Sequence, residues 1–166
     1  MERVLVKEMA DQTEVLLRNV GTTLRTCQPG RSLYGQPMWK HVYHMLHSLD
    51  QWFINPMEYD EPSFHRPGLN SLDETSDDAL DMAQLTAYYE SIAAKIRRYL
   101  AGLNDADLSQ CPPGFPRPRL SVMVGQMRHC MCHVGNINAV TIEATGRWPR
   151  ATGLTPVPDG ADPDWE

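Results

Sequence analysis

Two histidines and two cysteines fall within five residues near the end of the chain, in the stretch RHCMCHVGN at residues 128–136. On a helix, His129 and His133 project from the same face, because each residue turns the chain by about 100°. Cys130 and Cys132 then lie on opposite shoulders of that face, where they cannot bond to each other. The spacing also lacks the C-x-x-C-H pattern of haem attachment and the glutamate of H-E-x-x-H proteases. We therefore take the histidine pair as the candidate ligands and the cysteines as incidental.

A second group of histidines lies earlier, in WKHVYHMLHSLDQWF at residues 39–53, where His41, His44 and His47 recur at steps of three. One imidazole from this group and the later pair would form a three-nitrogen set. Such a set leaves a divalent ion an open position for water or substrate, which is typical of a catalytic rather than a structural site. The spacing leaves open which of the three contributes. It also leaves open the alternative that all these histidines are ordinary core or surface residues.

The elements that must position these residues are helices. Apolar residues recur at helical steps, among them Leu5, Leu16 and Val20 in the first stretch. No strand-type alternation competes with this period, and a long connection at residues 56–80 gives room for a crossover. We predict an all-α fold, a four-helix bundle in which that connection joins the second and third helices. The helices are expected at residues 2–27, 37–55, 82–103 and 121–146, the last with Ser121 as its N-cap.

The chain divides into a helical domain at residues 1–149 and an acidic tail rich in proline and glycine at 150–166. The tail is expected to lie on the surface of the domain or to be disordered. The 56–80 connection contains His65 and could cover the histidines as a lid, although an ordinary surface connection is the more frequent use of such a segment.

Composition narrows the function further. The 166 residues include 42% hydrophobic and 22% charged residues, and the net charge is −6. This sign disfavours general binding to nucleic acid or to an anionic membrane. The first residues contain no apolar signal region, and no apolar run is long enough to span a bilayer. We therefore expect a cytoplasmic protein with reduced cysteines and no membrane or nucleic-acid partner.

The combination of YHMLHSLD at residues 43–50, RHCMCHVGNIN at 128–138 and the closing TGRWP resembles the DinB-like superfamily (damage-inducible, YfiT-like) of metal-dependent bundle proteins. The resemblance covers nearly the whole chain in helix order and loop lengths. It implies that His44, His129 and His133 are the metal ligands. It also implies a DinB-like bundle topology, a divalent ion such as nickel, zinc or iron, and a homodimer. Met45 and Cys132 depart from the usual pattern without touching this triad.

The resemblance further implies a thiol-dependent S-transferase, which joins a low-molecular-weight thiol to a small electrophilic molecule. A hydrolase that uses metal-activated water is the close variant. Gln126 and Asn136, one turn either side of the histidine pair, could orient a substrate, and His47 could support the site or replace His44. Asp50 is expected to brace the structure, so no carboxylate is placed as a general base. The alternative is a non-catalytic dimeric stress or binding protein with structural or vestigial histidines.

Overall fold

The computed structural model describes residues 2–76, 78–153, 155 and 157–166. The chain is mostly helical, with one two-stranded sheet among the described residues, so the all-α prediction is confirmed. No helix in this part of the chain has both the length and the apolar character that a membrane span requires. The elements in chain order are α1 (Val4–Thr26), β1 (Ser32–Leu33), β2 (Gln36–Pro37), α2 (Met38–Trp52), the 3-10 helix η1 (Pro56–Glu58), α3 (Met82–Gly102), α4 (Asp105–Leu108) and α5 (Arg119–Thr145).

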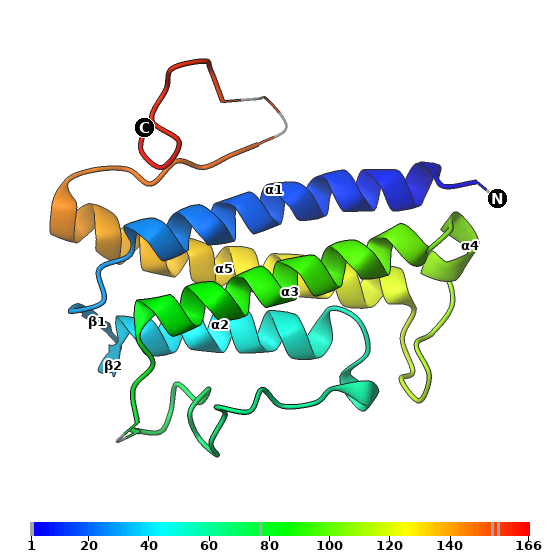
Figure 1. Ribbon diagram of the computed structural model, residues 1–166, viewed down its shortest axis with the longest axis horizontal. Helices are drawn as coiled ribbons and strands as arrows, with labels where there is room; N and C mark the ends of the chain where they lie inside the picture. The colour runs from blue at the N-terminus through cyan, green and yellow to red at the C-terminus, as the bar shows by residue number, and fades with distance from the viewer. Residues whose placement is uncertain (1, 77, 154, 156) are drawn as a thin grey trace.

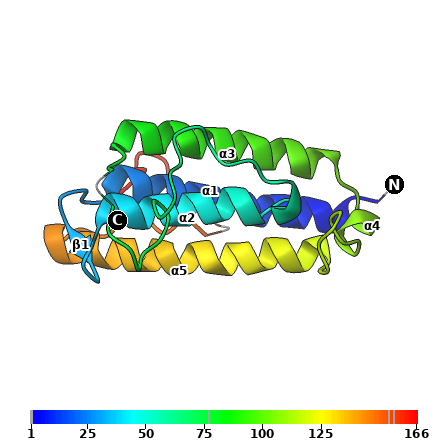
Figure 2. The same cartoon turned by 90° about the horizontal axis from the view of Figure 1, so that it is seen from below.

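The four long helices run side by side along the molecule (Figure 1). Seen from below, α3 and α5 lie on opposite sides, with α1 and α2 between them (Figure 2). Both α1 and α2 pack against α3 and α5. The residues buried between them form one apolar core, to which α1 contributes Leu17 and Val20, α2 contributes Leu46, α3 contributes Ile92 and α5 contributes Ile137.

The helix boundaries follow local chemistry. Asp81 begins α3 as part of a capping box, because its side chain accepts a hydrogen bond from Gln84 N while the Gln84 side chain accepts one from Asp81 N. Gly146 ends α5 in the left-handed conformation, at a φ of 69° that favours glycine. The predicted N-cap of this helix was wrong. The helix starts at Arg119 after Pro118, whose fixed φ suits that position, so Ser121 lies within the first turn.

A short hairpin precedes α2. Ser32 pairs with Pro37 and Leu33 with Gln36, and the two residues of the turn, Tyr34 and Gly35, both have positive φ. This is the turn geometry that matches the twist of paired strands. The sequence analysis predicts no strand here, because two-residue strands carry no alternation to detect.

The segment between α2 and α3 runs along the outside of α2 (Figures 1 and 2). The carbonyl of Glu74 accepts hydrogen bonds from the buried Lys40 side chain and from Gln36 Nε2. At the other end, the Asn55 side chain donates to Pro113 O at 3.1 Å and accepts from Met57 N. Side chains of β2, of α2 and of the residue before η1 therefore hold the two ends of this segment.

The described part of the tail lies against α1. Asn19 exchanges two hydrogen bonds with the backbone of Thr152, and Arg25 forms an ion pair with Asp164 at 2.7 Å. Trp165 pairs with Pro149 in an isolated bridge and lies under the Arg147 guanidinium. Of the two alternatives for the tail, these contacts favour a segment that lies on the surface of the helical domain.

Candidate metal centre

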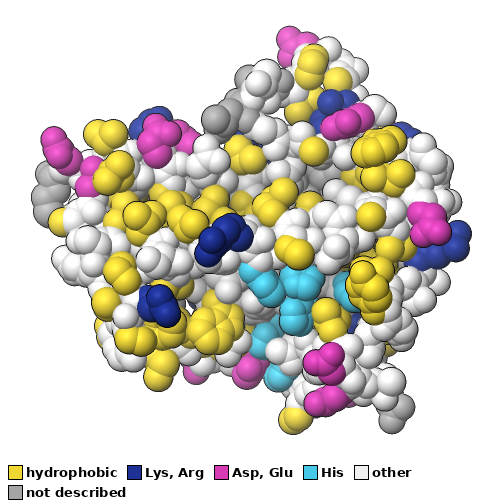
Figure 3. All heavy atoms as spheres, turned by 180° about the vertical axis from the view of Figure 1, so that it is seen from behind, with side chains coloured by type: hydrophobic (Ala, Val, Ile, Leu, Met, Phe, Trp, Pro, Cys, Tyr) yellow, Lys and Arg dark blue, Asp and Glu magenta, His cyan; other side chains and the backbone are white. Residues whose placement is uncertain are grey.

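The three predicted ligands lie together between α2 and α5. The ring centroid of His44 is 5.6 Å from that of His129 and 4.7 Å from that of His133. The two rings of α5 are 4.6 Å apart, as expected for residues one turn apart on the same face. All three side chains are half-buried. Histidine side chains gather on the face of the molecule opposite to that of Figure 1, and parts of them reach the surface there (Figure 3).

The ring of His44 is held in one tautomer. Its Nδ1 lies 2.7 Å from the backbone carbonyl of Asn70, in the segment between α2 and α3. A carbonyl can only accept, so Nδ1 must carry the proton, and the lone pair is on Nε2. An outer partner of this kind is what orients a metal-ligating imidazole and raises its basicity. His44 is thus prepared to bind a cation through Nε2.

The other two rings each bury a nitrogen without a partner. Nε2 of His129 and Nδ1 of His133 are inaccessible to solvent and make no hydrogen bond with the part of the chain that the structure describes. Buried polar atoms are almost always satisfied, so two such atoms in adjacent rings point to a missing ligand. One nitrogen from each of the three rings lies within 4.8 Å of the others. Tetrahedral zinc holds its nitrogen ligands about 3.4 Å apart, so small side-chain movements would close the group around an ion.

The protonation state also suits a cation. Burial, followed by the nearby His44 and His129 rings, lowers the pKa of His133 from 6.5 to about 4. Burial lowers the pKa of His129 as well. At neutral pH both rings are therefore neutral, which is the form that binds metals.

The metal-free protein should lose stability in mild acid through His133. The unfolded ring takes up a proton as the pH falls below 6.5, whereas the folded ring resists protonation until about pH 4, so acid favours the unfolded chain in this interval. Because solvent partly screens the half-buried ring, we expect the contribution to fall by about 1 kcal/mol between pH 7 and pH 5. Urea unfolding in chelator at the two pH values measures this. The fall should be about 1 kcal/mol smaller in His133→Gln, and an equal fall in both proteins would contradict the assignment.

Of the residues predicted to support the centre, Gln126 makes the contacts that best fit the orientation of a substrate. Its Oε1 accepts a hydrogen bond from Ser48, one turn beyond His44 on α2, at 3.3 Å. Gln126 also lines a small cavity of about 170 Å³ with Trp52 and Arg117. Asn136 is exposed at the surface of α5. The structure thus joins Gln126 to both helices of the centre and leaves Asn136 facing solvent.

The two other histidines of α2 have different partners. His41 is buried and donates through Nε2 to Leu33 O in the hairpin at 2.8 Å. His47 is also buried, and its Nε2 lies 2.7 Å from a carboxylate oxygen of Glu61. Nδ1 of His47 contacts the side-chain amide of Asn70, the residue whose carbonyl holds His44. His47 is therefore linked to the centre through Asn70.

Three residues of the 56–80 segment were not singled out as partners of these histidines. Asn70 contacts both His44 and His47, and Glu61 and His65 gather around His47. The sequence contains no signal for Asn70 or Glu61, since their positions depend on how an irregular segment folds back on α2. Asp50, in contrast, takes the predicted bracing role, because it accepts hydrogen bonds from Tyr88 and Lys95.

The cysteines lie outside the centre. Cys130 is buried, and burial raises the pKa of its thiol to about 12. Cys132 is exposed on the opposite side of the helix turn. A protonated, buried thiol is a poor nucleophile and a poor metal ligand.

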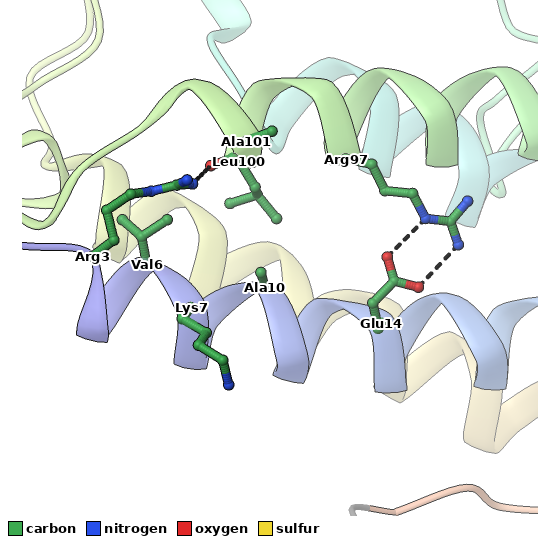
Figure 4. A pocket seen from close by; sticks show the side chains of 8 residues that line it. All are labelled: Arg3, Val6, Lys7, Ala10, Glu14, Arg97, Leu100 and Ala101. Carbon is green, nitrogen blue, oxygen red and sulfur yellow. Dashed lines mark hydrogen bonds and ion pairs between the residues drawn. The ribbon is translucent and has the colours of Figure 1, made fainter.

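A larger groove of about 410 Å³ lies elsewhere, between α1 and α3 (Figure 4). Its charged side chains have partners within the chain. Glu14 and Arg97 form a two-point ion pair at 2.7 and 3.0 Å, and Arg3 donates to Leu100 O. The residues that line this groove include no histidine and no charged side chain without a partner. It is therefore a weaker candidate for a reactive site than the smaller cavity beside Gln126.

Comparison with known proteins finds no match: no protein-family model, no curated protein and no solved structure matches this chain.

Proposed function

We propose that this protein is a metal-dependent enzyme of the DinB-like type, with His44, His129 and His133 as the ligands of a divalent ion. The observation that carries the proposal is the pair of buried, unpartnered nitrogens on His129 and His133 beside a His44 ring of fixed tautomer. Nickel, zinc and iron all accept imidazole nitrogen. The proposed topology is a four-helix bundle in which the segment after α2 forms the crossover to α3.

The reaction we propose is transfer of a low-molecular-weight thiol to a small electrophile, with hydrolysis as the close variant. A bound divalent ion supplies Lewis acidity, which lowers the pKa of a thiol or of water toward neutrality. The protein residues hold this centre in place. Asn70 fixes the His44 ring, and Gln126, held by Ser48, is placed to orient a substrate group. Among the described residues this group contains only the three imidazoles, so the proposed activation would rest on a bound ion rather than on a general base.

The surroundings of Gln126 support a small anionic co-substrate. Arg117 lines the cavity beside Gln126 and also a neighbouring surface depression of about 550 Å³, together with Arg128. Both arginines are exposed. Low-molecular-weight thiols such as glutathione carry carboxylates, which guanidinium groups bind through paired hydrogen bonds. This depression is therefore the proposed entry for the thiol.

One observation favours the alternative, a non-catalytic dimeric binding protein. Leu120, Val124 and Met131 of α5 are large apolar residues with 38–42% of their surface exposed. They follow one side of the helix, and exposed apolar patches frequently mark contact surfaces. We propose that α5 contributes to a homodimer. Leu120 and Val124 also line the depression proposed as the thiol entry, so a dimer that covers them fits the non-catalytic alternative better.

Metal analysis of the purified protein tests the proposal. We expect about one ion per chain at this centre, lost in the His129→Ala/His133→Ala double variant. The loaded protein should then turn over an electrophile such as a chlorinated aromatic with glutathione or bacillithiol, both of which carry carboxylates, and the double variant should not. A metal-free protein whose melting temperature does not change in chelator would instead support the non-catalytic alternative.

A further inference from the structure

A second group of possible ligands lies on the other side of Asn70. His47 of α2 is buried, with 3% of its side chain exposed, and it meets Glu61 and His65 from the segment that follows. Nε2 of His47 lies 2.7 Å from Oε2 of Glu61, and Nδ1 of His65 lies 3.8 Å from the same oxygen. The two imidazole rings are stacked, with centroids 4.9 Å apart. Two imidazoles and a carboxylate therefore converge on a small volume.

The separations suit a coordinated cation. Bonds of 2.0–2.2 Å in a tetrahedral arrangement place neighbouring ligand atoms about 3.4 Å apart. The observed 2.7 and 3.8 Å lie on either side of that value, and one ligand atom from each residue lies within 4.8 Å of the others. Glu61 has 47% of its side chain exposed, which gives an ion a path from solvent.

We propose that His47, Glu61 and His65 form a second divalent-cation site, with the two-histidine, one-carboxylate ligand set that occurs at catalytic zinc centres. The ligands differ from those of the first centre, so this site does not depend on the proposed function. The carboxylate offsets one of the two charges of the ion, which the all-imidazole centre cannot do. The ion would join two residues of an irregular segment, Glu61 and His65, to α2.

Asn70 can adapt to either state of His47. In the ion-free protein, the Asn70 amide donates to Nδ1 of His47, which places the ring proton on Nε2, facing Glu61. With an ion on Nε2, the proton moves to Nδ1. A half-turn of the Asn70 amide then presents its oxygen as the acceptor, so the hydrogen bond is kept with its direction reversed. The ring carries one proton in both arrangements, on a different nitrogen in each.

The competing explanation is that the three residues only fasten the segment to α2 through hydrogen bonds. Tyr43, which is fully buried, contributes to such a network, since its hydroxyl lies 2.8 Å from Nδ1 of His65. The two explanations differ in what removal of the Glu61 charge does. If the three residues only fasten the segment, removal of the Glu61 charge should lower the stability of the protein with or without ions. If they form an ion site, the same change should remove one ion-binding event.

Calorimetric titration of the metal-free, full-length protein with Zn²⁺ tests the proposal. We expect two ions per chain in the original protein and one in Glu61→Gln. Loss of an outer-shell partner already lowers metal affinity by about 10-fold or more, so loss of a direct ligand should weaken the second site by at least that factor. Glu58→Gln changes an exposed acid of the same segment and should still bind two. His65→Gln serves as a second variant with the same expected loss. Melting in chelator shows that the variants are folded.

The two centres can be separated in the same experiment. The His129→Ala/His133→Ala variant should retain one ion, which disappears when Glu61→Gln is added. Retention of both ions in Glu61→Gln and His65→Gln would overturn the second site and leave the first intact. A single ion in the original protein that is lost in the double histidine variant would overturn it equally. An ion lost only in Glu61→Gln would support the second site and contradict the proposed function.

Discussion

Replacing His44 with alanine should weaken Zn²⁺ binding at the first centre by about 100-fold or more. Removal of a direct ligand costs more than removal of an outer-shell partner, for which losses of about 10- to 100-fold are typical. Two imidazoles of α5 remain in this variant, but they leave an ion with one protein ligand fewer than catalytic zinc sites usually have. Competition with a chromophoric chelator, in the Glu61→Gln background so that one site is titrated, measures the change.

His41→Gln is the matched control for this experiment. His41 lies on the same helix, one turn earlier, and its role in the structure is a hydrogen bond to Leu33 O. Glutamine can still donate to that carbonyl. The affinity of this variant should stay within about 3-fold of the original, well inside the 10-fold loss of an outer-shell partner. A large loss in His41→Gln with little effect of His44→Ala would show that the structure assigns the wrong residue of α2.

Replacing Leu17 with alanine should lower the free energy of unfolding by about 2–5 kcal/mol, the range for leucine in a packed core. Leu17 is fully buried in α1, the helix that packs against both α3 and α5. Its backbone carbonyl also accepts the hydrogen bond of the buried Tyr89 hydroxyl, so the surrounding structure has little freedom to collapse into the cavity. Urea unfolding at pH 7, with chelator present, measures the loss.

Leu5→Ala makes the same chemical change in the same helix at a site that is 58% exposed. Its effect should stay within about 0.5 kcal/mol, as is usual for surface positions. Similar losses in both variants would mean that α1 does not form the core in the way described.

These two leucines also show how far helical periodicity predicts a core. The apolar stripe of α1 was correct at Leu16 and Val20, which are buried, but wrong at Leu5. Val6 takes the buried position there, since Val6 N is held by the Asp105 side chain of α4. The position of α4 depends on tertiary contacts, which the period of a single helix cannot report.

The candidate centre divides in a similar way. Helix geometry alone places His129 and His133 on one face, because both lie on one continuous element. The choice of His44 among three histidines came from a family resemblance, and spacing could not supply it. The hydrogen bonds of Asn70 could not be predicted from the sequence. An irregular segment has no period, and its course depends on tertiary contacts such as the one between Lys40 and Glu74.

Asn70 touches one histidine through its backbone and another through its side chain, and this double contact restricts how the segment between α2 and α3 can vary in length. Surface connections ordinarily tolerate insertions and deletions. Here the register of residues 59–70 along α2 fixes the position of a carbonyl against His44. An engineer who wished to graft a peptide or a reporter into this protein would therefore do better to choose another exposed turn, such as that at Tyr34 and Gly35, which faces solvent.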